Sequence, residues 1–221
     1  MRWTTDTLLV MARLYYLVGE DAVLFNSDED GSDRAFNGNT LAAGGPEHLA
    51  LLTGTHTGEI RLSLEQLLSE PGLPAEDWDT VVEVSIYSTS GKLWLNDGEG
   101  EMHPTAGNLA HAGPGWYRVR AHARGRDLGH AQDTPDTWVE EHLVSVWPAP
   151  PQPDVVHRIT DEFGLAHYDP QRPPSAPIHP ADALPWAKRV ADAKVRAWAE
   201  QFGYGAQDQA RIVEAINSAT A

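Results

Sequence analysis

The residues best suited to chemistry in this sequence are carboxylates, and they are densest in the stretch NSDEDGSD at positions 26–33. The four acidic side chains in this stretch are Asp28, Glu29, Asp30 and Asp33. Carboxylates at this density can hold a calcium ion, attract a basic partner, or lie in a solvated loop. Each interpretation makes a different demand on the neighbouring residues.

The calcium interpretation can be compared with the twelve-residue loop that binds this ion. With Gly31 at its sixth position, such a loop places oxygen ligands at positions one, three and five. Those positions are Asn26, Asp28 and Asp30, which fit. Position twelve is Asn37, where a bidentate Glu belongs, and the flanking residues predict strands instead of helices. These departures count against calcium, and we predict no metal site here.

A second acidic group supports the partner interpretation. The segment QDTPDTWVEE, residues 132–141, supplies four more carboxylates: Asp133, Asp136, Glu140 and Glu141. Carboxylates on one face can take the positions where a basic cleft expects phosphates, and opposite charge speeds the encounter. We therefore predict a partner-binding surface that contains both acidic groups, with a solvated loop as the alternative for each.

The charge of the whole chain favours the same partner. The 221 residues carry a net charge of −16, and residues 1–150 contain 23 acidic but only 9 basic side chains. A field of this sign repels nucleic acids and anionic membranes and attracts basic proteins. We predict a basic protein as partner, without nucleic acid or membrane binding. Solubility is the alternative reason for the acidity.

Other chemistry has less support in the sequence. The chain has no cysteine, which excludes disulfides and thiolate sites. Its ten histidines occur singly, without an HExxH pattern, and there is no GxSxG or GxGxxG motif. We therefore predict no enzyme activity, catalytic residue, metal or cofactor. The eight tryptophans leave a small-ligand or carbohydrate-binding protein as an alternative function.

We predict that strands position the carboxylates. These strands extend to about residue 150. Up to that point, apolar and polar residues alternate with period two, which is typical of half-buried strands. Seven strands are predicted, at 8–19, 48–54, 58–65, 80–88, 91–97, 115–125 and 140–148. Short strands separated by Gly, Pro and Asp turns favour a mainly β fold, an antiparallel two-sheet sandwich.

Two proline-rich stretches follow the predicted sandwich. Residues 147–154 and 169–185 contain ten of the sixteen prolines, and proline cannot donate to a sheet ladder. Residues 183–202 and 206–219 then show helical spacing. We predict an acidic sandwich over 1–150, a proline-rich connector over 151–182 and a helical extension over 183–221. Docking of the extension onto a larger assembly is a further alternative function.

The predicted location is the cytoplasm. No stretch has the roughly 20 apolar residues of a membrane helix, and the start MRWTTDTLLVMARLYYLVG lacks the basic region and cleavage site of a signal peptide.

Four segments resemble an uncharacterised actinobacterial family of acidic β-sandwich proteins: LALLTGTHTGEIRLSLE, DWDTVVEVSIY, GWYRVRAHARGRD and EEHLVSVWPAPP. The resemblance covers about residues 8–160. That family is similar to competence protein J, a small inhibitor of a DNA-entry nuclease, in its strand order and its G-x-Y-x-(V/L) strand. The resemblance implies a non-enzymatic inhibitor or immunity protein that blocks a basic nuclease, either a competence nuclease or a toxin. It implies no catalytic residues.

Overall fold

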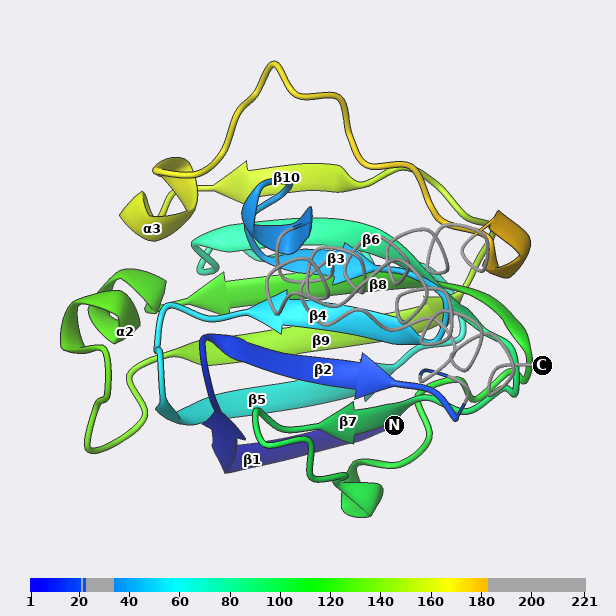
Figure 1. Ribbon diagram of the computed structural model, residues 1–221, viewed down its shortest axis with the longest axis horizontal. Coiled ribbons are helices and arrows are strands. Elements are labelled where there is room, and N and C mark those ends of the chain that lie inside the picture. The colour runs from blue at the N-terminus through cyan, green and yellow to red at the C-terminus, as the bar shows by residue number, and fades with distance from the viewer. Residues whose placement is uncertain (21, 23–33, 183–221) are drawn as a thin grey trace, which may run out of the picture.

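The computed structural model describes residues 1–20, 22 and 34–182, which form two β-sheets packed face to face (Figure 1). The strands are β1 (Arg2–Val10), β2 (Leu14–Val18), β3 (Ala42–Gly44), β4 (His48–Leu52), β5 (Gly58–Gln66), β6 (Thr80–Ser88), β7 (Trp94–Asn96), β8 (Gly115–Arg124), β9 (Glu141–Pro148) and β10 (Val155–Ile159). The short helices are η2 (Pro104–Ala106), α2 (Arg126–Gln132) and α3 (Glu162–Leu165). None of the helices in this part of the chain could span a membrane.

The larger sheet has six strands in the order β1-β5-β9-β8-β6-β10. Its neighbours are antiparallel except β5 and β9, which pair in parallel from Arg61 opposite Glu141 to Gln66 opposite Val146. The prediction of two sheets is therefore confirmed, but the prediction that both are antiparallel is wrong. A period-two pattern identifies a strand and its buried face without giving the direction of its neighbour.

The smaller sheet has the antiparallel order β3-β4-β2-β7. Its strand β2 and the strand β1 of the larger sheet were predicted as one strand over 8–19. The chain instead turns at Ala12 and Arg13, whose φ angles are 51° and 67°. Such left-handed angles are uncommon outside glycine, and the continuous apolar run conceals the turn. The chain thus leaves one sheet at Val10 and enters the other at Leu14.

The hydrophobic core lies between the two sheets. The larger sheet contributes Val84, Val119 and Val144, and the smaller sheet contributes Leu17 and Leu51, all with no exposed surface. Each fully buried side chain of this size contributes about 1.5–3 kcal/mol to folding. In β6 the core residues Val82 and Val84 alternate with the polar residues Glu83 and Ser85, as period two requires.

Where β6 and β8 run side by side, the opposite face of the larger sheet is polar but also buried. Glu83 of β6 lies between two arginines of β8: its carboxylate oxygens are 3.1 Å from Arg118 Nη2 and 2.6 Å from Arg120 Nε. Arg120 also donates to the carbonyl of Gly72, and Arg118 donates to the carbonyl of Gln152 at 3.0 Å. Two chain segments therefore cover this face and complete the arginine hydrogen bonds.

The predicted connector over 151–182 contains regular structure. Residues Val155–Ile159 form β10, which pairs antiparallel with β6 and makes an edge of the larger sheet. The prolines stand on either side of this stretch and not inside it, so every residue of β10 keeps its N–H donor. The sheet therefore continues past residue 150. The predicted helices at 183–202 and 206–219 lie outside the described residues.

Candidate functional site

The structure places one of the two predicted acidic groups. The residues of the other group lie outside the described part of the chain: Asp28, Glu29, Asp30 and Asp33. The placed group follows α2 and runs into β9, and its members differ in burial. Asp133 and Asp136 are exposed, Glu141 is half-buried, and Glu140 has no exposed surface.

Residues 133–138 form a loop that is anchored at its first residue. The Asp133 carboxylate lies 3.1 Å from Arg13 Nη2. Its backbone carbonyl accepts the N–H groups of His56 at 2.8 Å and Thr57 at 3.3 Å. Buried Pro135 holds the loop further, so Asp136 is presented from a fixed base.

The same loop ends in an aromatic side chain. Trp138 is 37% exposed, and the guanidinium of Arg61 lies 5.5 Å from its ring centroid. Within six residues, loop 133–138 thus contains two exposed carboxylates and one large aromatic side chain that is partly exposed.

Glu140 belongs to a buried hydrogen-bond chain between the sheets. Its carboxylate accepts the N–H groups of Gly54 at 3.0 Å and Thr55 at 2.8 Å, and the Thr55 hydroxyl at 2.9 Å. His142 Nε2 lies 2.8 Å from Glu140 Oε1, and the Tyr15 hydroxyl lies 3.0 Å from His142 Nδ1. The chain connects β2, the turn after β4, and β9.

The surroundings of Glu140 and Tyr15 in this chain shift their pKa values in opposite directions. Burial alone would raise the pKa of Glu140, but the hydrogen bond and charge of His142 and the N–H groups of Thr55 and Gly54 outweigh it and lower this pKa. Burial and the nearby Glu140 charge raise the pKa of Tyr15.

Glu140 therefore has a structural role and cannot contact a partner at the surface. The sequence contains a signal for this position. Glu140 lies in phase with Val144 and Val146 of β9, whose side chains face the core. Glu141 is out of phase, and its carboxylate lies 2.6 Å from Arg124 Nη2 on the other face.

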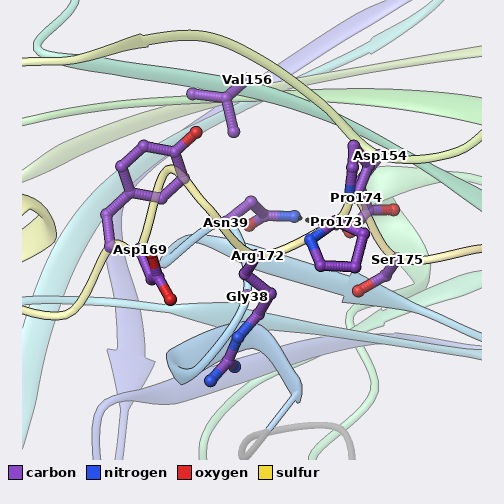
Figure 2. Close-up of a pocket in the computed structure, with 10 residues that line it drawn as sticks. Gly38, Asn39, Asp154, Val156, Asp169, Arg172, Pro173, Pro174 and Ser175 are labelled. Carbon is purple, nitrogen blue, oxygen red and sulfur yellow. Dashed lines mark hydrogen bonds between the residues drawn. The ribbon is translucent and has the colours of Figure 1, made fainter.

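A pocket of about 150 Å³ lies at the start of β10 (Figure 2). Its polar lining comes from three segments far apart in the sequence: Asn39, Asp154, Tyr168, Asp169, Arg172 and Ser175. The Asp154 N–H donates to the Ser175 carbonyl at 3.0 Å, and the Arg172 guanidinium donates to the Asn37 carbonyl. These bonds hold the second proline-rich stretch against the sheet edge as one wall of the pocket.

Asp154 is a partly buried titratable group in the wall of this pocket. Asn39 Nδ2 donates to Asp154 Oδ2 at 3.0 Å (Figure 2). It also donates to the Ala42 carbonyl at 2.8 Å. Burial raises the pKa of Asp154 to about 6, although the charge of Arg34 and the hydrogen bond from Asn39 offset part of the effect. Carboxyl groups that titrate near neutrality in a cleft are frequent in functional sites.

No local sequence pattern predicts this pocket. Asn39, Asp154 and Asp169 share no motif, and they meet because β10 pairs with β6 and the chain then turns back along it. The only sequence signal was the proline density, which was interpreted as a connector. Among the described residues, no group of three or more His, Cys, Asp or Glu side chains is arranged to hold a metal ion.

Comparison with known proteins gives similarity in structure but not in sequence. No protein-family model matches the chain, and no curated protein matches it in sequence. One similar solved structure is crocagin biosynthetic gene J, with a TM-score of 0.40 and 16% identity over 68% of this chain and 99% of that chain. Another is ComJ from Bacillus subtilis, inhibitor of the DNA-degrading activity of NucA. Its TM-score is 0.44, with 10% identity over 67% of this chain and 96% of that chain.

Proposed function

We propose that this protein is a non-enzymatic inhibitor or immunity protein that binds a basic nuclease through an acidic surface. The observation that carries the proposal is loop 133–138. It presents Asp133, Asp136 and Trp138 from an anchored base in a protein whose net charge is −16. Asp28, Glu29, Asp30 and Asp33 are predicted to extend this surface.

In the described part of the chain, the basic side chains are engaged in contacts within the protein. The described part of the chain contains eleven arginine and lysine residues, and each of them has a polar or ring partner. Arg118, Arg120 and Arg126 are buried. The exposed carboxylates therefore set the field that an approaching protein meets.

Loop 133–138 combines the two properties that a binding surface for a basic cleft needs. Its carboxylates steer a basic partner and take the positions of substrate phosphates. Trp138 supplies apolar contact area, and tryptophan is enriched among the residues that dominate binding energy at interfaces. Inhibition would then follow from occlusion of the nuclease cleft.

The test measures degradation of labelled duplex DNA by the nucleases in an extract of the producing organism. We expect purified protein to reduce this activity, and we expect the effect to weaken between 50 and 300 mM salt because the attraction is screened. The double variant Asp133→Asn/Asp136→Asn should inhibit at least tenfold less.

The matched control is Glu99→Gln/Glu101→Gln, which removes the same charge from two exposed residues outside the loop. It should inhibit as the unmodified protein does. Absence of any inhibition would refute the proposed function. An equal loss in both double variants would refute the role of loop 133–138, because only the net charge would then matter.

The pocket at Asp154 favours a second candidate function, binding of a small ligand. Its lining predicts the chemistry of that ligand.

A further inference from the structure

We propose that the pocket at Asp154 is a binding site for an alkylguanidinium or alkylammonium group. The pocket shares no residue with loop 133–138, so this inference does not depend on nuclease inhibition.

The polar groups of the pocket are mainly hydrogen-bond acceptors. Asn39 has no donor to offer, because both of its amide protons are used on Ala42 and Asp154. The Arg172 guanidinium donates to the Asn37 carbonyl, and Figure 2 shows it directed away from Asp154. The carboxylates of Asp154 and Asp169 therefore determine what the pocket can hold.

Both carboxylates retain capacity for a ligand. Asp154 accepts one bond from Asn39, and Asp169 accepts one from the N–H of Gln171 at 2.9 Å. A carboxylate has about four acceptor sites. A group with several N–H donors and a positive charge matches a carboxylate better than a neutral group does.

The size and apolar lining of the pocket fit the end of an alkyl chain. A volume of about 150 Å³ is comparable to a cavity that admits a benzene-sized molecule. This is room for a guanidinium or ammonium group with its adjoining methylenes. Val156, Pro173 and Pro174 supply apolar surface for those methylenes.

The electrostatic state of Asp154 makes such binding dependent on pH. Arg34 and Arg118 act on its charge, and Tyr168, Asp169 and Arg172 line the same pocket. Burial has a larger effect on the pKa of Asp154 than these neighbours have, so this pKa is about 6. A cation beside Asp154 is attracted to its ionised form, so affinity should fall as the carboxyl group becomes protonated.

The test uses two probes of nearly identical shape on the full chain. N-acetyl-arginine methylamide carries the guanidinium, and N-acetyl-citrulline methylamide replaces it with a neutral urea. In an NMR titration at pH 7.5, we expect the arginine probe to shift the backbone amides of Asn39, Asp154 and Ser175 saturably. The citrulline probe should bind at least tenfold more weakly, and the affinity for the arginine probe should fall about tenfold between pH 7.5 and pH 5.

Two variants complete the test. Asp154→Asn should weaken binding of the arginine probe at least tenfold and remove its pH dependence. Glu99→Gln makes the same change of net charge at an exposed residue outside both the pocket and loop 133–138, and it should leave the affinity and its pH dependence unchanged. Asp154→Asn should fold normally, because it replaces a half-buried charge by a neutral group of the same shape. A urea unfolding curve checks this.

Equal binding of the two probes, an unchanged affinity in Asp154→Asn, or shifts confined to residues outside the pocket would each overturn the inference. Agmatine, which has the guanidinium without peptide groups, distinguishes the source of the ligand. Tighter binding of agmatine indicates a free amine, whereas tighter binding of the arginine probe indicates the side chain of a protein. A protein that does not inhibit any nuclease could still bind the arginine probe at this pocket. The two proposals can therefore fail separately.

Discussion

Glu140 and Glu141 are adjacent in the sequence and have opposite surroundings. Glu140 faces the core, where four donors from Gly54, Thr55 and His142 surround its carboxylate. Glu141 faces the other side of the sheet and pairs with Arg124, whose side chain is 40% exposed. The same residue type is thus a buried connector in one position and a surface ion pair in the next.

This difference can be measured by removing each charge in turn. Glu140→Gln should lower the free energy of unfolding by about 3 kcal/mol, because it breaks a buried charged network and brings an amide NH₂ against donors. Glu141→Gln, its matched control, should cost about 1 kcal/mol or less because the pair is partly solvated. Urea denaturation at pH 7 measures both.

The cost of Glu140→Gln should also depend on pH. The folded protein lowers the pKa of Glu140, so its stabilisation is complete above the unfolded pKa of about 4.3 and is lost as the pH falls through the lower folded value. The free energies of unfolding of the unmodified protein and of Glu140→Gln should therefore approach each other as the pH falls. A cost that stays constant from pH 7 to pH 3 would show that Glu140 does not act through its charge.

Local charge density in the sequence predicts acidic residues at the surface with mixed success. Asp133 and Asp136 were predicted to lie on a binding surface, and the structure shows that both are exposed. Glu140 was assigned to the surface because charge density does not report the phase of a strand. Charge density does not reveal Asp154, because its partners are distant in the chain. Asn39 lies more than a hundred residues before it, and Ser175 lies about twenty residues after it.

At the scale of elements, α2 and α3 are connected by a buried ion pair. Arg126 at the start of α2 lies 2.7 Å from Asp161 Oδ1 and donates to the Thr40 carbonyl at 2.6 Å. Asp161 also accepts the Gly164 N–H, as the N-cap of α3. Gly164 allows this approach, since a Cβ there would lie 2.6 Å from Arg126 Nη2. The pair fixes the segment that follows β10 to the rest of the fold.

We expect Arg126→Lys to lower the free energy of unfolding by about 3 kcal/mol, because an ammonium cannot reproduce the planar, multi-donor contact of a buried guanidinium. Amide hydrogen exchange in β10 should also become faster. Arg158→Lys is the control, since Arg158 donates to the carbonyls of Ala75 and Trp78 near the surface, and it should cost under about 1 kcal/mol. Equal costs in the two variants would show that Arg126 does not secure this region.

The strands that were predicted well are those with clean alternation. β6 has the predicted bounds, and β5, β8 and β9 differ from theirs by one residue at an end. β4 and β7 are shorter than predicted. The other exceptions are β1 and β2, joined by a turn of non-glycine residues with positive φ, β3, which lies outside every predicted strand, and β10, which lies within the predicted connector. Turn geometry at such residues and pairing with a distant strand are tertiary effects that local patterns do not contain.

At the scale of the whole molecule, the net charge of −16 acts on stability as well as on binding. Like charges over one surface repel and weaken the compact state, and salt screens this repulsion. We expect the midpoint of thermal unfolding at pH 7.5 to rise by a few degrees between 10 and 200 mM sodium chloride. Potassium chloride, as the control, should have the same effect if screening is the cause. A midpoint that falls with salt would show that the surface ion pairs outweigh the repulsion.

The position of β9 has a consequence for how the chain reaches this structure. β5 and β6 follow one another in the sequence, but β9 and β8 separate them in the sheet. A nascent chain can pair β1 with β5 and β6 with β8, yet these two half-sheets have no common edge until residues Glu141–Pro148 leave the ribosome and insert between them. Closure of the sheet is therefore a late, long-range step, and topologies of this kind fold slowly. Until then the edges of β5 and β8 remain open to wrong partners, so a chain interrupted before Glu141 should be a substrate for chaperones.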